Sequence, residues 1–223
     1  MIPWIQLDSA TIPGGREELR LKRRGDEFSI MLGTNELMNS RLSGSEEALA
    51  RLSCAKIGGR PRVRVLIGGL GMGFTLRAAL AELPPDAAVV VAELVPPVVA
   101  WARGPMAELF AGCLDDPRVE IREADVAAEI ASAKPAYDAI LLDVDNGPDG
   151  LSRSENDRLY SIRGLAAARA ALRPRGVLAV WSAHPDRTFA ARLRQSGFEV
   201  EEVNTRARGK RGARHVIWLA TRP

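Results

Sequence analysis

A buried strand that runs straight into a glycine-rich turn constrains the fold of this chain more than any other feature. Residues 63–67 are almost continuously apolar, and the turn after them contains four glycines: Gly68, Gly69, Gly71 and Gly73. Glycine permits a tight turn and a close backbone approach, and a helix that starts there presents unpaired N–H groups. A purely structural strand-to-helix connection also uses glycine, but the position of this turn favours a ligand-binding role.

Strand and helix patterns alternate from this turn to the end of the chain. Apolar strands are predicted at residues 63–67, 87–92, 118–122, 137–143 and 177–181, with a closing pair at 198–203 and 215–220. The helices predicted between them include one over residues 96–110 and one over residues 155–172. Continuous apolar strands separated by helices indicate a parallel sheet covered on both faces, and the closing pair requires one antiparallel strand. We expect an α/β fold with a doubly wound, mostly parallel, seven-stranded Rossmann-like sheet.

The first sixty residues follow a different pattern. Apolar and polar residues alternate over residues 18–32 around a turn at Gly25, which predicts a β-hairpin, and residues 36–39 form a further extended piece. A helix is predicted to open at Ser45 and to run to about residue 56. We expect a small β-rich piece with a linking helix over 1–60 and the Rossmann-like domain over 61–223. Exposed strand edges in the hairpins favour pairing between two copies of the chain.

The composition and the apolar runs of the sequence indicate where in the cell the protein resides and whether it holds a metal. No apolar run in the 223 residues approaches the roughly 20 needed to cross a bilayer, and the N-terminus lacks the basic start and apolar stretch of a signal peptide. Two cysteines and two histidines occur, at no metal-ligand spacing. We expect a cytoplasmic protein without a metal site.

Acidic residues follow the predicted strands at the edge where ligands bind in such sheets. Glu93 ends the second strand, roughly 20 residues past the glycine turn, where a carboxylate can accept both hydroxyls of a ribose. Asp125 follows the third strand, where it could accept a hydrogen bond from an adenine amino group. With the glycine turn, Glu93 and Asp125 predict a site that contacts an adenosine-bearing ligand at three points.

The fourth strand ends in a crowded acidic loop. Asp143, Asp145 and Asp149 lie among glycine, asparagine and proline residues. Like charges raise each other's pKa and call for a cationic or proton-donating partner, which suits binding or deprotonating an amine or holding a sulfonium. A solvated turn uses the same residue types and is the alternative.

Residues 62–182 resemble the polyamine aminopropyltransferases (spermidine synthases) and their relatives among class I S-adenosylmethionine-dependent methyltransferases. The similarity is carried by the segments from Leu66 to Arg77, Val91 to Leu94, Asp115 to Arg118 and Tyr137 to Asp143. It implies that the glycines surround the methionine part of S-adenosylmethionine or its decarboxylated form. It further implies that Glu93 holds the ribose, that Leu94 packs on the adenine, and that Asp125 and the backbone of Val126 contact its edge.

The same resemblance places Asp143 opposite the reactive sulfonium and the incoming nucleophile, with Asp145 in support. The chain departs from the family pattern after Asp143, where Asn146 and Gly147 replace an aspartate and a proline, and it lacks a Tyr-His-Glu triplet. We therefore expect a methyltransferase that acts on an unidentified small acceptor, with Trp181 and His184 lining the acceptor pocket. The alternative is aminopropyl transfer from decarboxylated S-adenosylmethionine to a diamine.

Two further classes of function stay open at this point. A nicotinamide dehydrogenase uses the same type of sheet, but the closing antiparallel pair and Asp125 argue against it. A non-catalytic nucleic-acid-binding protein would use the basic residues between Arg206 and Arg214. That segment has no interleaved aromatic residues, so a solvated hairpin tip is the preferred interpretation and nucleic acid is not an expected partner.

Overall fold

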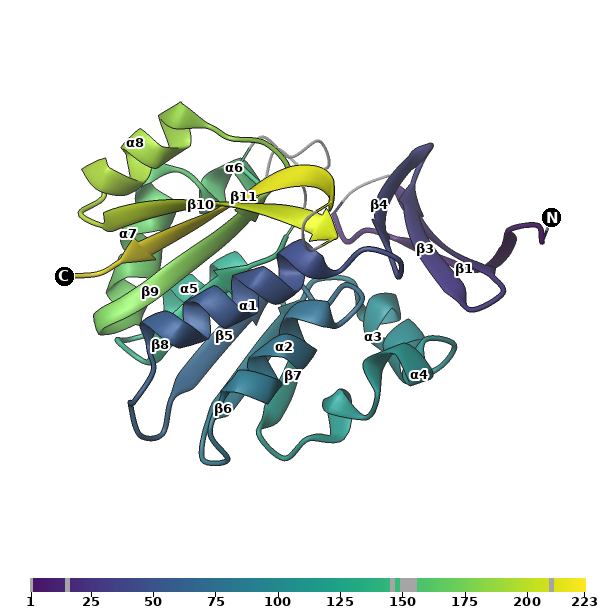
Figure 1. The fold of residues 1–223 in the computed structure, drawn as a ribbon, viewed down its shortest axis with the longest axis horizontal. Coiled ribbons are helices and arrows are strands. Elements are labelled where there is room, and N and C mark those ends of the chain that lie inside the picture. The colour runs from purple at the N-terminus through teal and green to yellow at the C-terminus, as the bar shows by residue number, and fades with distance from the viewer. Residues whose placement is uncertain (1, 15–16, 145–146, 149–155, 209–210) are drawn as a thin grey trace.

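The structure is a computed structural model that describes residues 2–14, 17–144, 147–148, 156–208 and 211–223. It contains a four-stranded sheet near the N-terminus and a seven-stranded sheet covered by helices on both faces (Figure 1). In the described residues no helix combines the length and the apolar character that a membrane span requires.

The four-stranded sheet is antiparallel, in the order β1-β2-β3-β4. Its strands are β1 (Ile5–Thr11), β2 (Glu18–Arg24), β3 (Glu27–Leu32) and β4 (Asn35–Asn39). The predicted hairpin is confirmed, because β2 and β3 pair around Gly25, whose φ is +58°. Strand β1 was not predicted. Its apolar residues Ile5 and Leu7 are exposed, and pairing with β2 holds the strand in place.

The seven-stranded sheet has the order β10-β11-β9-β8-β5-β6-β7. Its strands are β5 (Arg64–Gly68), β6 (Ala88–Glu93), β7 (Val119–Glu123), β8 (Tyr137–Leu142), β9 (Leu172–Ser182), β10 (Glu199–Arg208) and β11 (Arg211–Thr221). Strands β5 to β9 run parallel, and β11 is antiparallel to both of its neighbours. The predicted doubly wound, mostly parallel sheet is confirmed.

The helices cover the sheet in two layers. They are α1 (Gly44–Lys56), α2 (Phe74–Glu82), α3 (Pro96–Arg103), α4 (Ala107–Phe110), α5 (Val126–Ser132), α6 (Asn156–Leu159), α7 (Ile162–Ala171) and α8 (Arg187–Gln195). Alternate strand residues feed two apolar clusters: Val65 and Ile67 pack with α1, α2 and α3, whereas Leu66 packs with α5, α7 and α8. This two-sided burial explains why the strands are apolar throughout.

Two predicted helices are interrupted. The helix expected over 96–110 breaks at Gly104 and Pro105, because a proline disfavours helical geometry in the residue before it. In the described part of the helix expected over 155–172, Ser161 starts a new helix. Its hydroxyl accepts a hydrogen bond from the backbone N–H of Gly164.

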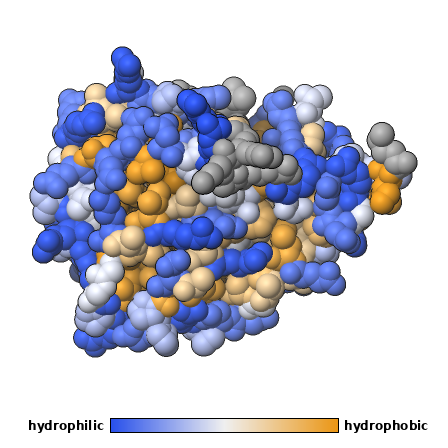
Figure 2. All heavy atoms as spheres, in the orientation of Figure 1, coloured by the Kyte–Doolittle hydropathy of each residue, from blue (hydrophilic) through white to orange (hydrophobic). Residues whose placement is uncertain are grey.

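The N-terminal sheet packs against the helical layer that carries α3. The indole Nε1 of Trp101 in α3 donates to Oδ2 of Asp8 in β1 over 2.7 Å. Leu21 and Ile30 join the apolar cluster of the α1–α3 layer. At the N-terminal end of the molecule Figure 2 shows apolar atoms at the surface, where Ile2 and Ile5 are exposed.

Candidate active site

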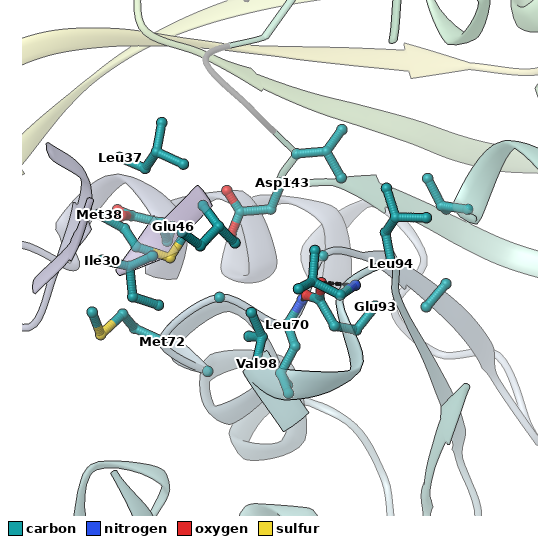
Figure 3. Close-up of a pocket in the computed structure, with 18 of the residues that line it drawn as sticks. Ile30, Leu37, Met38, Glu46, Leu70, Met72, Glu93, Leu94, Val98 and Asp143 are labelled. Carbon is teal, nitrogen blue, oxygen red and sulfur yellow. Dashed lines mark hydrogen bonds between the residues drawn. The ribbon is translucent and has the colours of Figure 1, made fainter. Parts of the chain in front are cut away.

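A pocket lies at the point where the strand order of the large sheet reverses. Strand β5 has β6 on one side and β8 on the other, and in open α/β sheets the carboxyl ends at such a point form the ligand crevice. The glycine turn after β5, the end of β6 and the end of β8 line the pocket. The four-stranded sheet closes it with apolar side chains, including Ile30, Leu37 and Met38 (Figure 3).

The glycine turn brings the backbone of two strands together. Gly69 has a φ of +86°, and a Cβ added there would lie 2.6 Å from the carbonyl oxygen of Asp143. Gly73 has a φ of +76°, and its Cβ would lie 2.5 Å from the ring of Phe110. A side chain at either position is therefore both strained and sterically blocked. Gly68, Gly69, Gly71 and Gly73 all lie at this turn, and the last three line the pocket.

Glu93 is buried at the carboxyl end of β6 and ties down the glycine turn. Its Oε2 accepts a hydrogen bond from the backbone N–H of Leu70 at 2.8 Å, and its Oε1 accepts one from Val95 at 2.9 Å. Burial raises the pKa of Glu93, and the backbone hydrogen bonds act in the opposite direction. Glu93 also lines the pocket, where a carboxylate can accept further hydrogen bonds from a ligand.

The remaining residues predicted to hold an adenosine also line the pocket. Leu94 lies beside Glu93, and Asp125 and Val126 lie at the start of α5. Oδ1 of Asp125 caps α5 by accepting from the backbone N–H of Ala127 at 2.8 Å. Its second oxygen has no role in that cap.

Asp143 follows β8 and faces the pocket next to a second carboxyl group. Its Oδ2 accepts a hydrogen bond from Thr75 Oγ1 at 2.6 Å. Burial and the nearby charge of Glu46 raise the pKa of Asp143 to about 7, although the Thr75 hydrogen bond lowers it. Asp145 lies outside the described residues, so its predicted role stays a prediction.

Glu46 is a charged residue of the pocket that the sequence analysis did not single out. It sits in the first turn of α1 and lines the pocket, and burial raises its pKa. Figure 3 shows Glu46 and Asp143 on the same side of the pocket, with Glu93 on the other. The sequence showed Glu46 only as part of a helix start, because acidic residues are common in a first helical turn whether or not they bind a ligand.

The charged lining of the pocket is acidic. Among the described residues, the ionisable side chains that line it are Glu46, Glu93, Asp125 and Asp143, and no lysine, arginine or histidine joins them. Trp181 lines the pocket as expected. His184 is exposed and is not among the lining residues, so the expectation that it borders the acceptor site is wrong.

The sheet order and the pocket at its switch point define a Rossmann-like α/β fold of the class I methyltransferase type. More particularly, the chain is spermidine synthase-like. It is 30% identical over 193 residues to the polyamine aminopropyltransferase of Mycobacterium tuberculosis, covering 82% of this chain and 35% of that protein. It is 35% identical over 127 residues to polyamine aminopropyltransferase 1 of Streptomyces coelicolor, covering 56% of this chain and 23% of that protein.

The spermidine synthase of Thermotoga maritima has the same fold. The two structures superpose with a TM-score of 0.78 at 20% sequence identity, over 98% of this chain and 73% of that one. No protein-family model matches the chain. In sequence, the chain matches about a quarter to a third of the length of the two curated relatives.

These relatives correct one expectation. A methyltransferase that acts on an unidentified small acceptor was the preferred function, and that prediction is wrong, because the curated relatives are named polyamine aminopropyltransferases. The departures after Asp143 and the absence of a Tyr-His-Glu triplet had suggested methyl transfer. In the folded protein Glu46 of α1 supplies a carboxyl group beside Asp143, which the linear comparison did not reveal.

Proposed function

We propose that this chain transfers an aminopropyl group from decarboxylated S-adenosylmethionine to a small amine. The observation that carries the proposal is the acidic lining of the pocket, in which no described cationic side chain takes part. Both substrates are cations near neutral pH, since the donor bears a sulfonium and an ammonium and the acceptor bears an ammonium. An acidic, partly enclosed pocket concentrates such ligands. The names of the sequence relatives support the same reaction.

The lining also favours the decarboxylated donor over S-adenosylmethionine itself. The α-carboxylate of S-adenosylmethionine would enter a pocket that already holds Asp143 and Glu46. Like charges at close range are unfavourable unless a cation or several N–H groups compensate for them. The decarboxylated donor places only positive charge there. We infer that the missing carboxylate is the feature by which this pocket distinguishes the two compounds.

The donor would lie along the carboxyl ends of β5 and β6. In this arrangement the glycine turn surrounds the aminopropyl-bearing end, Glu93 accepts from the ribose hydroxyls, and Leu94 packs against the adenine. The second carboxylate oxygen of Asp125 accepts from the adenine amino group, and the backbone of Val126 contacts the base edge. Each of these residues lines the pocket.

The acceptor would lie between two carboxyl groups, Asp143 and Glu46 (the carboxyl pair), and the apolar side chains of the N-terminal sheet. Leu37 and Met38 offer contact to the methylene groups of an aliphatic amine, and Asp143 and Glu46 hold its nitrogen. The donor supplies an electrophilic carbon bonded to a positively charged sulfur. The carboxyl pair takes a proton from the acceptor ammonium, and orientation of the free amine supplies much of the rate acceleration.

Calorimetric titration with the two donors side by side tests the proposal. We expect tighter binding of decarboxylated S-adenosylmethionine, followed by release of 5′-methylthioadenosine when an aliphatic diamine such as 1,4-diaminobutane is added. Chromatography separates that product from S-adenosylhomocysteine. Preference for the carboxylated donor with formation of S-adenosylhomocysteine would contradict the proposal, and so would binding of neither compound.

A further inference from the structure

A chain of hydrogen bonds leads from Glu46 in the pocket, through Ser45, to the closing strand pair. Oγ of Ser45 donates to Oε2 of Glu46 at 2.7 Å, and Nδ1 of His215 lies 2.9 Å from the same Ser45 oxygen. Ser45 is fully buried in the first turn of α1. His215 belongs to β11, 170 residues away in the sequence, so only the packing of α1 against the closing strand pair creates the contact.

The direction of each hydrogen bond follows from the number of protons available. Ser45 has one hydroxyl proton, and an ionised Glu46 can only accept, so Nδ1 of a neutral His215 must carry a proton and donate it to Ser45. When Glu46 is protonated, the direction of both hydrogen bonds reverses. Glu46 then donates to Ser45, and Ser45 donates to the lone pair of Nδ1. Transfer along these two hydrogen bonds moves one proton from Glu46 to His215 and leaves Glu46 ionised and both ring nitrogens protonated.

The surroundings of His215 favour onward release of that proton. His215 is half-buried and its ring packs edge-on against Trp181, with ring centroids 4.8 Å apart. Burial lowers the pKa of His215, and the charge of His184 lowers it further. At the pocket end, burial raises the pKa of Glu46, and Glu47 and Asp143 add like charge on that side.

The proposed reaction needs a route by which a proton leaves the pocket. An acceptor ammonium must lose one proton before its nitrogen can attack. The new C–N bond then forms as the C–S bond breaks, and the sulfur keeps the electron pair as a neutral thioether. The product is a secondary ammonium, so each turnover releases one proton into the pocket. The carboxyl pair must return to its ionised form before the next cycle.

We propose that Ser45 and His215 form a proton relay that carries this proton from Glu46 to solvent. The inference rests on the proposed function for its source of protons. Glu46 receives the proton from the amine, Ser45 passes one to Nδ1, and the imidazolium loses one from Nε2. The ring is then protonated on Nδ1 and must return to the Nε2–H tautomer before it accepts the next proton. Ser45 and His215 are positioning residues, because they act through Glu46 and contact no reacting atom. The other carboxyl group, Asp143, is hydrogen-bonded to Thr75 and shares the titration of the pair.

Histidine NMR on the ligand-free protein tests the relay independently of any activity. The chain has two histidines, so a His184→Gln background leaves His215 as the single imidazole signal. Above the pH at which the carboxyl pair ionises, we expect the ¹⁵N shifts of the Nδ1–H tautomer, and Ser45→Ala should shift them toward the Nε2–H tautomer. A matched control is Ser53→Ala, which removes a second fully buried hydroxyl of α1 that bonds Leu49 O at 2.7 Å. An Nε2–H tautomer in the parent, or the same spectrum with Ser45→Ala as with Ser53→Ala, would overturn the relay.

Turnover with decarboxylated S-adenosylmethionine and 1,4-diaminobutane tests whether the relay takes part in the reaction. We expect Ser45→Ala and His215→Ala to lower kcat by about ten-fold or more and to enlarge the solvent deuterium isotope effect, with the donor KM unchanged. Imidazole in the medium should restore part of the rate of His215→Ala, which a merely structural role would not allow. Equal losses of kcat in Ser45→Ala and Ser53→Ala would overturn the relay. A parent protein that binds neither donor would instead overturn the proposed function, and the NMR result would still decide whether the proton chain exists.

Discussion

The hydroxyl of Thr75 donates a 2.6 Å hydrogen bond to Oδ2 of Asp143 and so ties the first turn of α2 to the carboxyl end of β8. The same hydroxyl lies 3.4 Å from the backbone oxygen of Glu46 at the start of α1. Three elements that bring chemistry to the pocket therefore meet at one side chain. The arrangement fixes Asp143 in place while burial and Glu46 keep its pKa high enough to take up a proton near neutral pH.

Replacement of Asp143 by asparagine should separate binding from turnover. Asparagine keeps an oxygen for the Thr75 hydrogen bond but cannot take up a proton. We expect kcat to fall by roughly 100-fold or more, with donor affinity changed only a few-fold. Steady-state kinetics and calorimetric titration of the same preparation measure the two effects. Equal losses in both would assign Asp143 to binding instead.

The same substitution should alter stability in a pH-dependent way. The folded-state pKa of Asp143 is raised from 3.8 to about 7, so its ionisation disfavours the folded state as the pH rises through this range. The asparagine side chain does not ionise, so Asp143→Asn should gain thermal stability relative to the parent as the pH rises from about 4 to about 7. Thermal unfolding at a series of pH values measures the difference. A gap in Tm that stays constant across the range would refute the shift.

Thr75 should tune the pH dependence of turnover. A hydrogen bond to the charged form of an acid lowers its pKa. Thr75→Val removes that bond while keeping the shape of the side chain. We expect the acidic limb of the kcat profile to move to higher pH. Thr75→Ser keeps the hydroxyl and serves as the control, with its limb expected at the parent position. A valine variant whose profile matches that of the serine variant would contradict the assignment.

Glu46 should decide how strongly the pocket prefers cationic ligands. Glu46→Gln removes one of the two carboxyl groups that meet the donor's charged end. The ratio of affinities for decarboxylated and carboxylated S-adenosylmethionine should therefore fall by several-fold. Glu47→Gln is the matched control: Glu47 lies in the same helical turn but is paired with Arg51 at 2.7 Å and does not line the pocket. Equal effects of the two substitutions would show a general charge effect rather than a site effect.

Gly69 should be irreplaceable for reasons beyond its backbone angle. Gly69 and Gly59 both have positive φ, but a Cβ at Gly59 would meet nothing within 4 Å, whereas one at Gly69 would lie 2.6 Å from the Asp143 carbonyl oxygen. We expect Gly59→Ala to cost about 1 kcal/mol from the left-handed conformation alone. Gly69→Ala should cost on the order of 1–3 kcal/mol more and should also abolish donor binding. Chemical denaturation and calorimetry measure the two effects, and similar costs at both positions would argue against the close approach.

The sequence by itself determined the doubly wound sheet and the part of the pocket that the glycine turn and Glu93 form. Strands buried on both faces must be apolar throughout, and a glycine turn after the first of them, with Glu93 after the next, marks the ligand edge through local chemistry alone. The breaks at Gly104 and Ser161 escaped prediction because each depends on a single residue. Strand β1 also escaped prediction, and it is held by pairing with β2.

The tertiary structure alone decided which side chains meet around Asp143 in the pocket. Glu46, Thr75 and Asp143 lie in three separate elements, and His215 comes from a fourth. Nothing in the local sequence distinguishes Ser45 and Glu46 from an ordinary helix start. Their chemistry appears only when α1 packs against α2 and the closing strand pair. Burial then raises the pKa of Glu46, and Ser45 comes within hydrogen-bond distance of His215.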